Sequence, residues 1–364
     1  MTQRNATVDI ARGIGIILVV LGHNWTVLQE RGELFRVIYS FHLPLFFFLS
    51  GLFLRDTDSP GKFALSRADS LLKPYFVVLV LLGVFMALNP LTASATRIAP
   101  LTYFSGVLYA TASTIAWAPL WFLPHLFVAL IVAMAILRTT VAARHRPAWL
   151  LLIASALLLM GIWWIGRFWQ ADTEALSFMG LKQLPGLPWS LDLMFISTAF
   201  ILAGFLFRTQ VASMHFSALG FLVSAVAFIS LHGYFDEAMD LNLRSYGNPL
   251  VSTLQAALGI YLVLSGSSLL QRYAVVRRPL TYIGAGSLVI LVFHGVAQGR
   301  AFLVLSRFSQ NDYLVGAASL AAGVLLPLLV LEIAKRQRYL AALLLPLPRK
   351  PGPLIPPQLS ETHP

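Results

Sequence analysis

The sequence predicts an all-α integral membrane protein with about ten transmembrane helices and both termini in the cytoplasm. Three observations lead to this prediction. Hydrophobic residues make up 58% of the chain and charged residues only 11%, whereas about a quarter of the residues of a soluble domain are charged. Long apolar runs follow one another along the 364 residues. The basic residues fall mainly in alternate connections between these runs.

Ten apolar segments are long enough to cross the roughly 30 Å hydrocarbon core of a bilayer, which takes about 20 helical residues. The expected spans are 8–28, 37–54, 74–90, 119–137, 148–166, 190–207, 215–233, 250–270, 279–297 and 313–334. The moderately apolar stretch 98–118 is typical of an interfacial helix, a re-entrant helix or a further span. The number of spans is therefore about nine to eleven.

The distribution of basic residues sets the orientation. If the N-terminus is cytoplasmic, the inside segments hold most of the 26 lysine and arginine residues, as the positive-inside rule requires. This orientation explains the formal net charge of +11 without a nucleic-acid partner. The first apolar run has no small-residue cleavage site, so we expect an uncleaved helix.

Two connections on the outer side, 167–188 and 234–248, are long enough to form the mouth of a substrate site. The second carries three acidic residues, Asp236, Glu237 and Asp240. We expect residues 1–340 to form one transmembrane domain and residues 341–364 to form a proline-rich, disordered cytoplasmic tail, because closely spaced prolines prevent a helix.

The first span carries two ionisable residues, Arg12 and His23. At about 100° per residue, eleven steps along an α-helix leave the two side chains on one face, roughly 16 Å apart along the axis. Each costs roughly 2.5 kcal/mol or more in hydrocarbon, so such residues usually serve a function. The structural alternative is an interhelical hydrogen bond for His23 and an interfacial anchor for Arg12.

Signatures of soluble enzymes are absent from the sequence. It has no cysteine, which excludes a cysteine nucleophile and a thiolate metal site. It also has no metalloprotease, serine-hydrolase or phosphate-loop motif, and we expect no metal. The polar groups that remain within the expected spans are Arg12, His23, His42, His125, Asp192, His294 and Glu332.

Five separated motifs follow one another along the chain: Asp9-x-x-Arg12-Gly13 with His23, Phe41-His42-Leu43-Pro44-Leu45-Phe46-Phe47, Arg67 with Leu72-Lys73-Pro74-Tyr75, Leu120-Trp121-Phe122-Leu123, and Ile283-Gly284 with Ser287 and His294. In this order they resemble the acyltransferase family 3 membrane proteins, which O-acylate carbohydrates of the cell envelope. Residues 188–205 are similar to the fucose 4-O-acetylase-like subgroup, and the size and layout resemble the xanthan exopolysaccharide acetyltransferases.

The resemblance implies acetyl-CoA as the acyl donor and a sugar hydroxyl of an envelope or exported polysaccharide as the acceptor, for example on a lipid-linked exopolysaccharide repeat unit. It implies location in the bacterial inner membrane, and the branch of the family that consists of the membrane domain alone. It also implies that Arg12 and His23 are the functional pair.

The chemistry of acyl transfer suggests individual roles. An alcohol attacks a thioester only with the help of a base of pKa near 7, so we expect His23 to be the general base. Direct transfer and an acetyl-imidazole intermediate both remain open. Asp192 and Asp9 are catalytic candidates because a carboxylate can orient an imidazole; a carboxylate that only stabilises a helix start is the alternative for each.

The remaining candidates bind the donor or the acceptor. Arg12, Arg67 and Lys73 are candidates for CoA phosphates, since basic side chains hydrogen-bond phosphate. The residues assigned to substrate binding are His42, Trp121 and His294. The ring of Pro44 removes a helix hydrogen bond next to His42, so a kink is expected there.

Two other classes of protein remain as alternatives. A proton-coupled secondary transporter or acyl-group carrier uses intramembrane histidines in the same way, although repeated halves and midplane carboxylates, which such proteins usually contain, are not evident. A noncatalytic membrane scaffold uses a proline-rich tail as a ligand for aromatic grooves.

Overall fold

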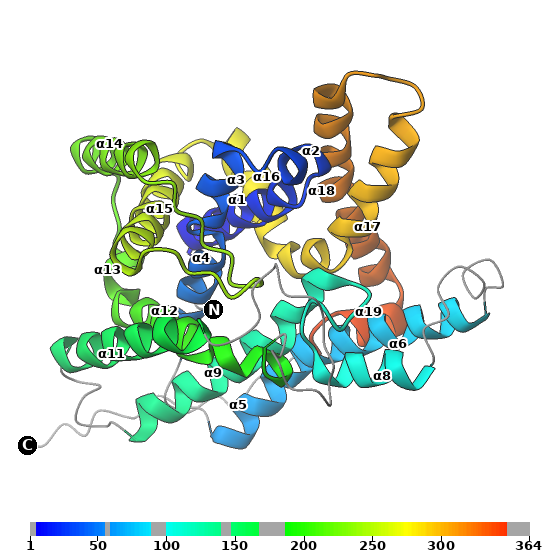
Figure 1. The fold of residues 1–364 in the computed structure, drawn as a ribbon, viewed down its shortest axis with the longest axis horizontal. Helices are drawn as coiled ribbons and strands as arrows, with labels where there is room; N and C mark the ends of the chain where they lie inside the picture. Colours follow the sequence, from blue (N-terminus) through cyan, green and yellow to red (C-terminus); the bar gives the residue numbers. More distant parts are fainter. Residues whose placement is uncertain (1–4, 55–58, 89–99, 140–146, 167–185, 348–364) are drawn as a thin grey trace, which may run out of the picture.

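The computed structural model describes residues 5–54, 59–88, 100–139, 147–166 and 186–347, which form a bundle of helices (Figure 1). Within these ranges the only β-type pairing is an isolated bridge between Asp240 and Ser245. In chain order the helices are α1 (Ala6–Gly22), α2 (Trp25–Glu30), α3 (Glu33–Tyr39), α4 (His42–Gly51), α5 (Pro60–Arg67), the π-helix η1 (Ala68–Leu72), α6 (Lys73–Leu88), α8 (Pro100–Tyr109), the 3₁₀-helix η2 (Ala118–Trp121), α9 (Phe122–Thr139), α11 (Pro147–Ile165), the 3₁₀-helix η3 (Pro188–Leu193), α12 (Met194–Leu206), α13 (Arg208–Ala212), α14 (Ala218–Tyr234), α15 (Pro249–Leu270), α16 (Ala274–Ala285), α17 (Ser287–Leu305), α18 (Asp312–Arg336) and α19 (Arg338–Leu344).

The expected all-α membrane fold is confirmed. Among the described residues, eight helical stretches are long and apolar enough to cross a membrane: Glu33–Gly51, Pro60–Leu88, Ala118–Thr139, Pro147–Ile165, Pro188–Leu206, Pro249–Leu270, Ser287–Leu305 and Asp312–Arg336. The expected spans 8–28 and 215–233 correspond to α1 and α14, which have 17 residues each. Both are slightly short of the usual 20 residues.

Three expected spans have different boundaries in the structure. The first ends at Gly22, because the side chain of Asn24 accepts a hydrogen bond from Thr26 and starts a new helix, α2. The second is broken at residues 40–41, so that α4 begins at His42, and Pro44 lies in its first turn, where no backbone donor is lost. The ninth is split at Gly286, and α17 continues to Leu305.

Two shorter regions also bear on the expectations. In its described part, the moderately apolar stretch 98–118 contains the ten-residue helix α8 and the first residue of η2. The expected boundary of the tail at residue 341 falls inside α19, and residues 348–364 lie outside the described residues. Most of the expected outer connection 167–188 lies outside them as well.

Helix α1 occupies the middle of the bundle and contacts α4, α15, α16 and α17 (Figure 1). Its contact with α16 depends on two glycines. A Cβ atom on Gly13 would overlap the backbone carbonyl of Leu280, and one on Gly284 would overlap the carbonyl of Asp9. Small residues allow this backbone-to-backbone approach, a common way of packing helices in membranes. The approach fixes the part of α1 that carries Arg12.

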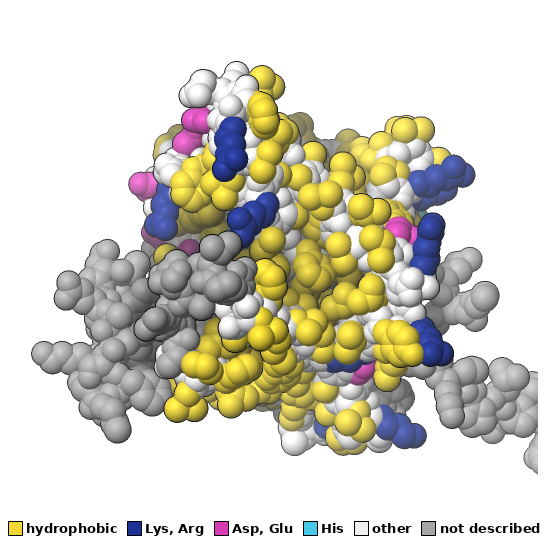
Figure 2. Space-filling view, turned by 90° about the vertical axis from the view of Figure 1, so that its right-hand side faces the viewer, with side chains coloured by type: hydrophobic (Ala, Val, Ile, Leu, Met, Phe, Trp, Pro, Cys, Tyr) yellow, Lys and Arg dark blue, Asp and Glu magenta, His cyan; other side chains and the backbone are white. Residues whose placement is uncertain are grey.

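The outer surface fits a bilayer. Figure 2 shows a broad area of hydrophobic side chains on one face, with lysine and arginine side chains mostly toward its margins. Large apolar side chains are exposed along several helices, among them Leu81 and Phe85 on α6, Trp163 on α11, Ile229 on α14 and Leu325 on α18. A soluble monomer rarely exposes so much apolar surface, whereas lipid covers it in a multi-pass membrane protein.

Candidate active site

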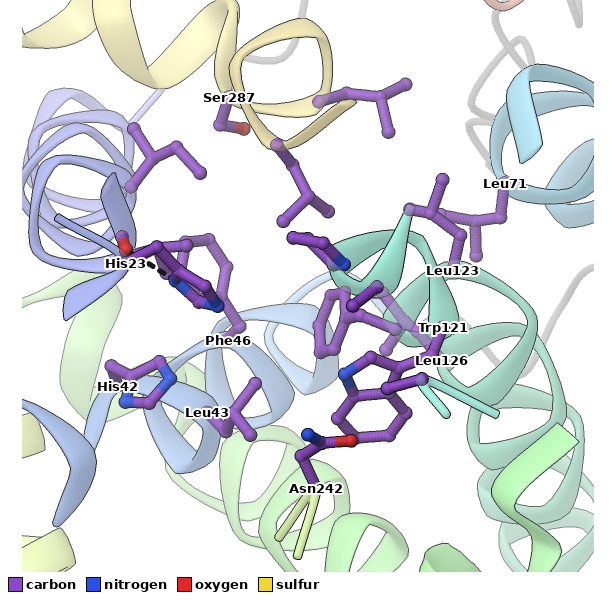
Figure 3. Close-up of a pocket in the computed structure, with 18 of the residues that line it drawn as sticks. His23, His42, Leu43, Phe46, Leu71, Trp121, Leu123, Leu126, Asn242 and Ser287 are labelled. Carbon is purple, nitrogen blue, oxygen red and sulfur yellow. Dashed lines mark hydrogen bonds between the residues drawn. The ribbon is translucent and has the colours of Figure 1, made fainter. Parts of the chain in front are cut away.

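A cavity of about 250 Å³ lies beside α1 and is enclosed by α4, η1, η2, α9, α17 and the connection 235–248 (Figure 3). Most of its wall is apolar. The polar and ionisable side chains in the lining are Arg12, His23, Tyr39, His42, Ser50, Ser70, Trp121, Asp240, Asn242 and Ser287. They come from distant parts of the sequence, which converge only in the folded chain.

Helix α1 contributes one continuous face to the cavity. The lining residues Arg12, Ile16, Val19 and His23 are spaced by four, three and four residues, which is the spacing of one helical face. The structure therefore brings Arg12 and His23 to the same cavity. Asp9 lies one turn before Arg12, with its carboxylate 3.7 Å from the guanidinium, but it is not part of the lining.

His23 lies at the end of α1, where the helix stops. Its ring Nδ1 is 2.8 Å from the carbonyl oxygen of Val19. Because a carbonyl only accepts, Nδ1 is the donor, and Nε2 is the basic nitrogen of the neutral ring. Figure 3 shows the ring facing the cavity.

The helix break around His23 is held by two later helices. Gln298 of α17 donates a hydrogen bond to the backbone carbonyl of His23, at 2.9 Å. The amide of Asn24 donates to the Gly316 carbonyl at 3.0 Å and to Ser319 Oγ at 3.1 Å, both on α18. The break is thus buried and hydrogen-bonded, which fixes the position of the imidazole.

Two more histidines, His294 and His42, lie near His23. The ring of His294 meets it edge-on, with centroids 5.2 Å apart, and His294 Nδ1 points to backbone carbonyls of its own helix. His42 lines the cavity and donates from Nδ1 to the Ile38 carbonyl at 2.9 Å. Tyr39 lies between His23 and His42, with ring centroids 6.4 and 4.8 Å from theirs. The cavity therefore has an aromatic, hydrogen-bonding wall on this side.

Away from this histidine wall, Arg12 and Ser287 lie at one end of the cavity. Arg12 also lies over the ring of Phe53, with its guanidinium carbon 5.3 Å from the ring centroid. The packing of Gly13 against α16 brings the start of α17, and with it Ser287, to this end. In Figure 3 Ser287 and Asn242 lie at opposite ends of the group of lining residues.

Asp192 is not part of the cavity lining and forms a buried ion pair with Arg244. Its carboxylate Oδ2 is 2.8 Å from Nε of Arg244, and its Oδ1 is 3.2 Å from Nη2. The backbone N–H of Leu187 also donates to Oδ1, at 2.7 Å. Asp192 thus joins η3 to the connection 235–248.

Among the sequence candidates for donor and acceptor binding, only some reach the cavity. Trp121 and His42 line it, and His294 lies behind His23. Arg67 lies over the ring of Phe63, at 5.0 Å, and is not part of the lining.

Lys73 is not part of the lining either. Its ammonium group donates to Asp69 Oδ1 and to the Leu345 carbonyl, both at 2.7 Å. It therefore ties the end of α19 to α6. The π-helix between Arg67 and Lys73 does reach the cavity, through Ser70 and Leu71.

Asp240 is a site residue that sequence reasoning did not select. The only signal was its position in an acidic outer connection. Burial raises the pKa of its carboxyl, and this effect is opposed by hydrogen bonds from the backbone N–H groups of Leu243 and Asn242 and by the nearby positive charge of Arg31. A half-buried carboxyl with a raised pKa at the same cavity as a basic imidazole is typical of a functional site.

The fold and the cavity together define a class: a multi-pass membrane protein in which an arginine, several histidines and a carboxylate converge on one internal cavity. A family model described as an acyltransferase domain matches residues 5–332. The chain therefore belongs to acyltransferase family 3, as the five motifs suggested, and it is a membrane acyltransferase. Comparisons with curated proteins and with solved structures gave no match.

Proposed function

We propose that this membrane acyltransferase moves an acetyl group from cytoplasmic acetyl-CoA to a sugar hydroxyl of an envelope or exported polysaccharide in the bacterial inner membrane. The observation that carries the proposal is that Arg12 and His23 line the same cavity. A phosphate-binding cation and a general base then act on two substrates that meet inside the membrane domain.

The donor occupies the end marked by Arg12. A guanidinium makes paired hydrogen bonds to phosphate, and the hydroxyl of Ser287 adds a donor at the same end of the cavity. At about 250 Å³ the cavity is below the usual size of a site that encloses a drug-sized ligand. It therefore takes only the reacting ends of the two substrates, the acetyl thioester of CoA and the acceptor sugar, while the nucleotide stays outside the Arg12 end.

The reaction follows from the position of His23. Nε2 of its imidazole removes the proton from the attacking sugar hydroxyl, and the oxygen forms a bond to the thioester carbonyl carbon. When the carbon–sulfur bond breaks, the CoA thiolate takes the proton from the imidazolium, so that CoA thiol and the O-acetyl sugar leave. The hydrogen bond from Nδ1 to Val19 keeps the ring oriented during both transfers.

The test measures transfer of radiolabelled acetyl from acetyl-CoA to glycan that has been chemically de-O-acetylated, with purified protein. His23→Ala should lower turnover by about 10²- to 10⁴-fold, the range for loss of a general base. Arg12→Ala should raise KM for acetyl-CoA. The matched controls, at exposed positions outside the cavity lining, are His215→Ala and Arg272→Ala.

Both controls should keep the activity of the unmodified protein. Transfer at the unmodified rate by His23→Ala and Arg12→Ala, in protein that elutes normally from gel filtration, would refute the site assignment.

A further inference from the structure

The connection between α14 and α15, residues 235–248, folds into the bundle instead of lying on its surface. Two backbone hydrogen bonds of 2.9 Å join Asp240 and Ser245 and close a tight turn. Met239, Leu241 and Tyr246 are buried. A connection that is expected on the outer side of the membrane thus has an apolar anchor inside the protein and a polar tip at the cavity.

The tip is held in place by the Arg244–Asp192 pair. Arg244 also donates to Ser190 Oγ at 3.2 Å and to the Asn242 carbonyl at 2.8 Å. Arg244, Trp189 and Ser190 all have positive φ, at 57°, 58° and 52°. Backbones in this region persist only where the surroundings fix them, and they gather at ligand sites.

The turn that Arg244 holds in place presents two polar side chains, Asp240 and Asn242, to the cavity. Figure 3 shows the amide of Asn242 beside the indole of Trp121. One carboxylate oxygen of Asp240 caps the turn by accepting from the Leu243 N–H at 3.2 Å, and a carboxylate has further acceptor positions. Asn242 offers both donors and an acceptor.

A carboxylate, an amide and an aromatic face suit one chemical class of ligand. Hydroxyl groups donate to a carboxylate and both donate to and accept from an amide, whereas the C–H face of a sugar ring packs on an aromatic ring. A thioester has no hydroxyl hydrogen to give to Asp240, and the negative charge of a phosphate would be repelled there. The tip therefore fits a polyhydroxylated acceptor and disfavours the donor.

We infer that Asp240 and Asn242, together with Trp121, form the acceptor subsite, in which they bind hydroxyl groups next to the one that is acetylated. The inference rests on the proposed function and extends it. It places the sugar at the Asn242 end of the cavity, the donor at the Ser287 end and His23 between them. The acceptor then approaches from the side that carries the connection 235–248, opposite to the donor.

The experiment compares Asp240→Asn and Asn242→Ala with a control on the same connection, Asp236→Asn. The side chain of Asp236 is 84% exposed and pairs with Arg36, so the control makes the same chemical change outside the cavity. KM is measured separately for de-O-acetylated glycan and for acetyl-CoA. Binding of the radiolabelled glycan is measured without any donor.

Asp240→Asn and Asn242→Ala should each raise the glycan KM about tenfold or more, which is the range for a lost hydrogen bond in a buried site. The KM for acetyl-CoA should not change, and this also shows that the variants are folded. The control should match the unmodified protein. A rise in the acetyl-CoA KM instead, an unchanged glycan KM, or an equal effect of Asp236→Asn would overturn the inference.

The two proposals fail in different ways. If the glycan binds, binds more weakly to Asp240→Asn, and yet is never acetylated, the acceptor subsite stands and the proposed reaction fails. If acetyl transfer occurs and Asp240→Asn keeps a normal glycan KM, the reaction stands and the subsite fails. Absence of glycan binding by the unmodified protein overturns the subsite.

Discussion

Breaking the Arg244–Asp192 pair should destabilise the protein, and replacing both residues should restore much of the loss. The two side chains are 2% and 0% exposed, so removal of either one leaves the other buried and uncompensated. Such a change costs about 3–5 kcal/mol, whereas an apolar pair of similar volume is often neutral. Asp192 keeps the Leu187 N–H, and Arg244 keeps the Asn242 carbonyl. The lower figure, about 3 kcal/mol, is therefore expected for each single variant.

The assay is thermal unfolding in detergent, followed by size-exclusion chromatography, for Asp192→Leu, Arg244→Met and the double variant. Both single variants should unfold at clearly lower temperature, and the double variant should lose less than the sum of the two. The single variants should also raise the glycan KM, because the connection 235–248 is no longer braced. Losses that simply add in the double variant, or single losses below about 1 kcal/mol, would refute the reasoning.

Three further predictions concern other parts of the molecule. Because burial raises the pKa of Asp240, the stability of the folded protein is higher at acid pH and falls as the pH rises through that pKa. Asp240→Asn should therefore unfold at a higher temperature than the unmodified protein at pH 7. The difference should shrink toward pH 4 in a pH series of melting curves. Gly284→Ala should separate α16 from α1, which lowers thermal stability and raises KM for acetyl-CoA. Gly299→Ala, with nothing within 4 Å of its added Cβ, should neither lower stability nor raise this KM, because alanine favours a helix. Equal losses in the two variants would count against the close helix contact. A chain truncated after Leu347 should keep full transfer activity, because the contacts of Lys73 and Asp69 with this end of the chain are retained; lost activity in a well-folded truncated protein would contradict this.

The local geometry of one helix could be predicted from the sequence. The eleven-residue spacing of Arg12 and His23 sets their common face, since helical periodicity depends only on neighbouring residues. The family motifs extended the prediction to Trp121 and His42, which also line the cavity. The expected spans came from composition, which fixes how much of the chain is apolar but says little about where a helix stops.

What could not be predicted depends on partners far away in the sequence. Two hydrogen bonds hold the helix break after Gly22: Gln298 of α17 donates to the carbonyl of His23, and Asn24 donates to the carbonyl of Gly316 in α18. Asp192 is paired with a residue 52 positions later, so its place in a helix start suggested nothing of its role. Lys73 meets a carbonyl 272 positions later. The site role of Asp240 likewise exists only because its connection folds inward.

The π-helix η1 determines how the two halves of the long helix from Pro60 to Leu88 are rotated relative to each other. A π-turn contains one more residue than an α-turn, and here consecutive residues, Ser70 and Leu71, both reach the cavity. Deleting one residue from η1 would turn everything before it by about 100° relative to α6. Arg67 and its neighbours would then swing to another side of the bundle, while the lipid-facing part beyond kept its place. One additional residue thus sets the rotational register between the basic end of this helix and its apolar remainder.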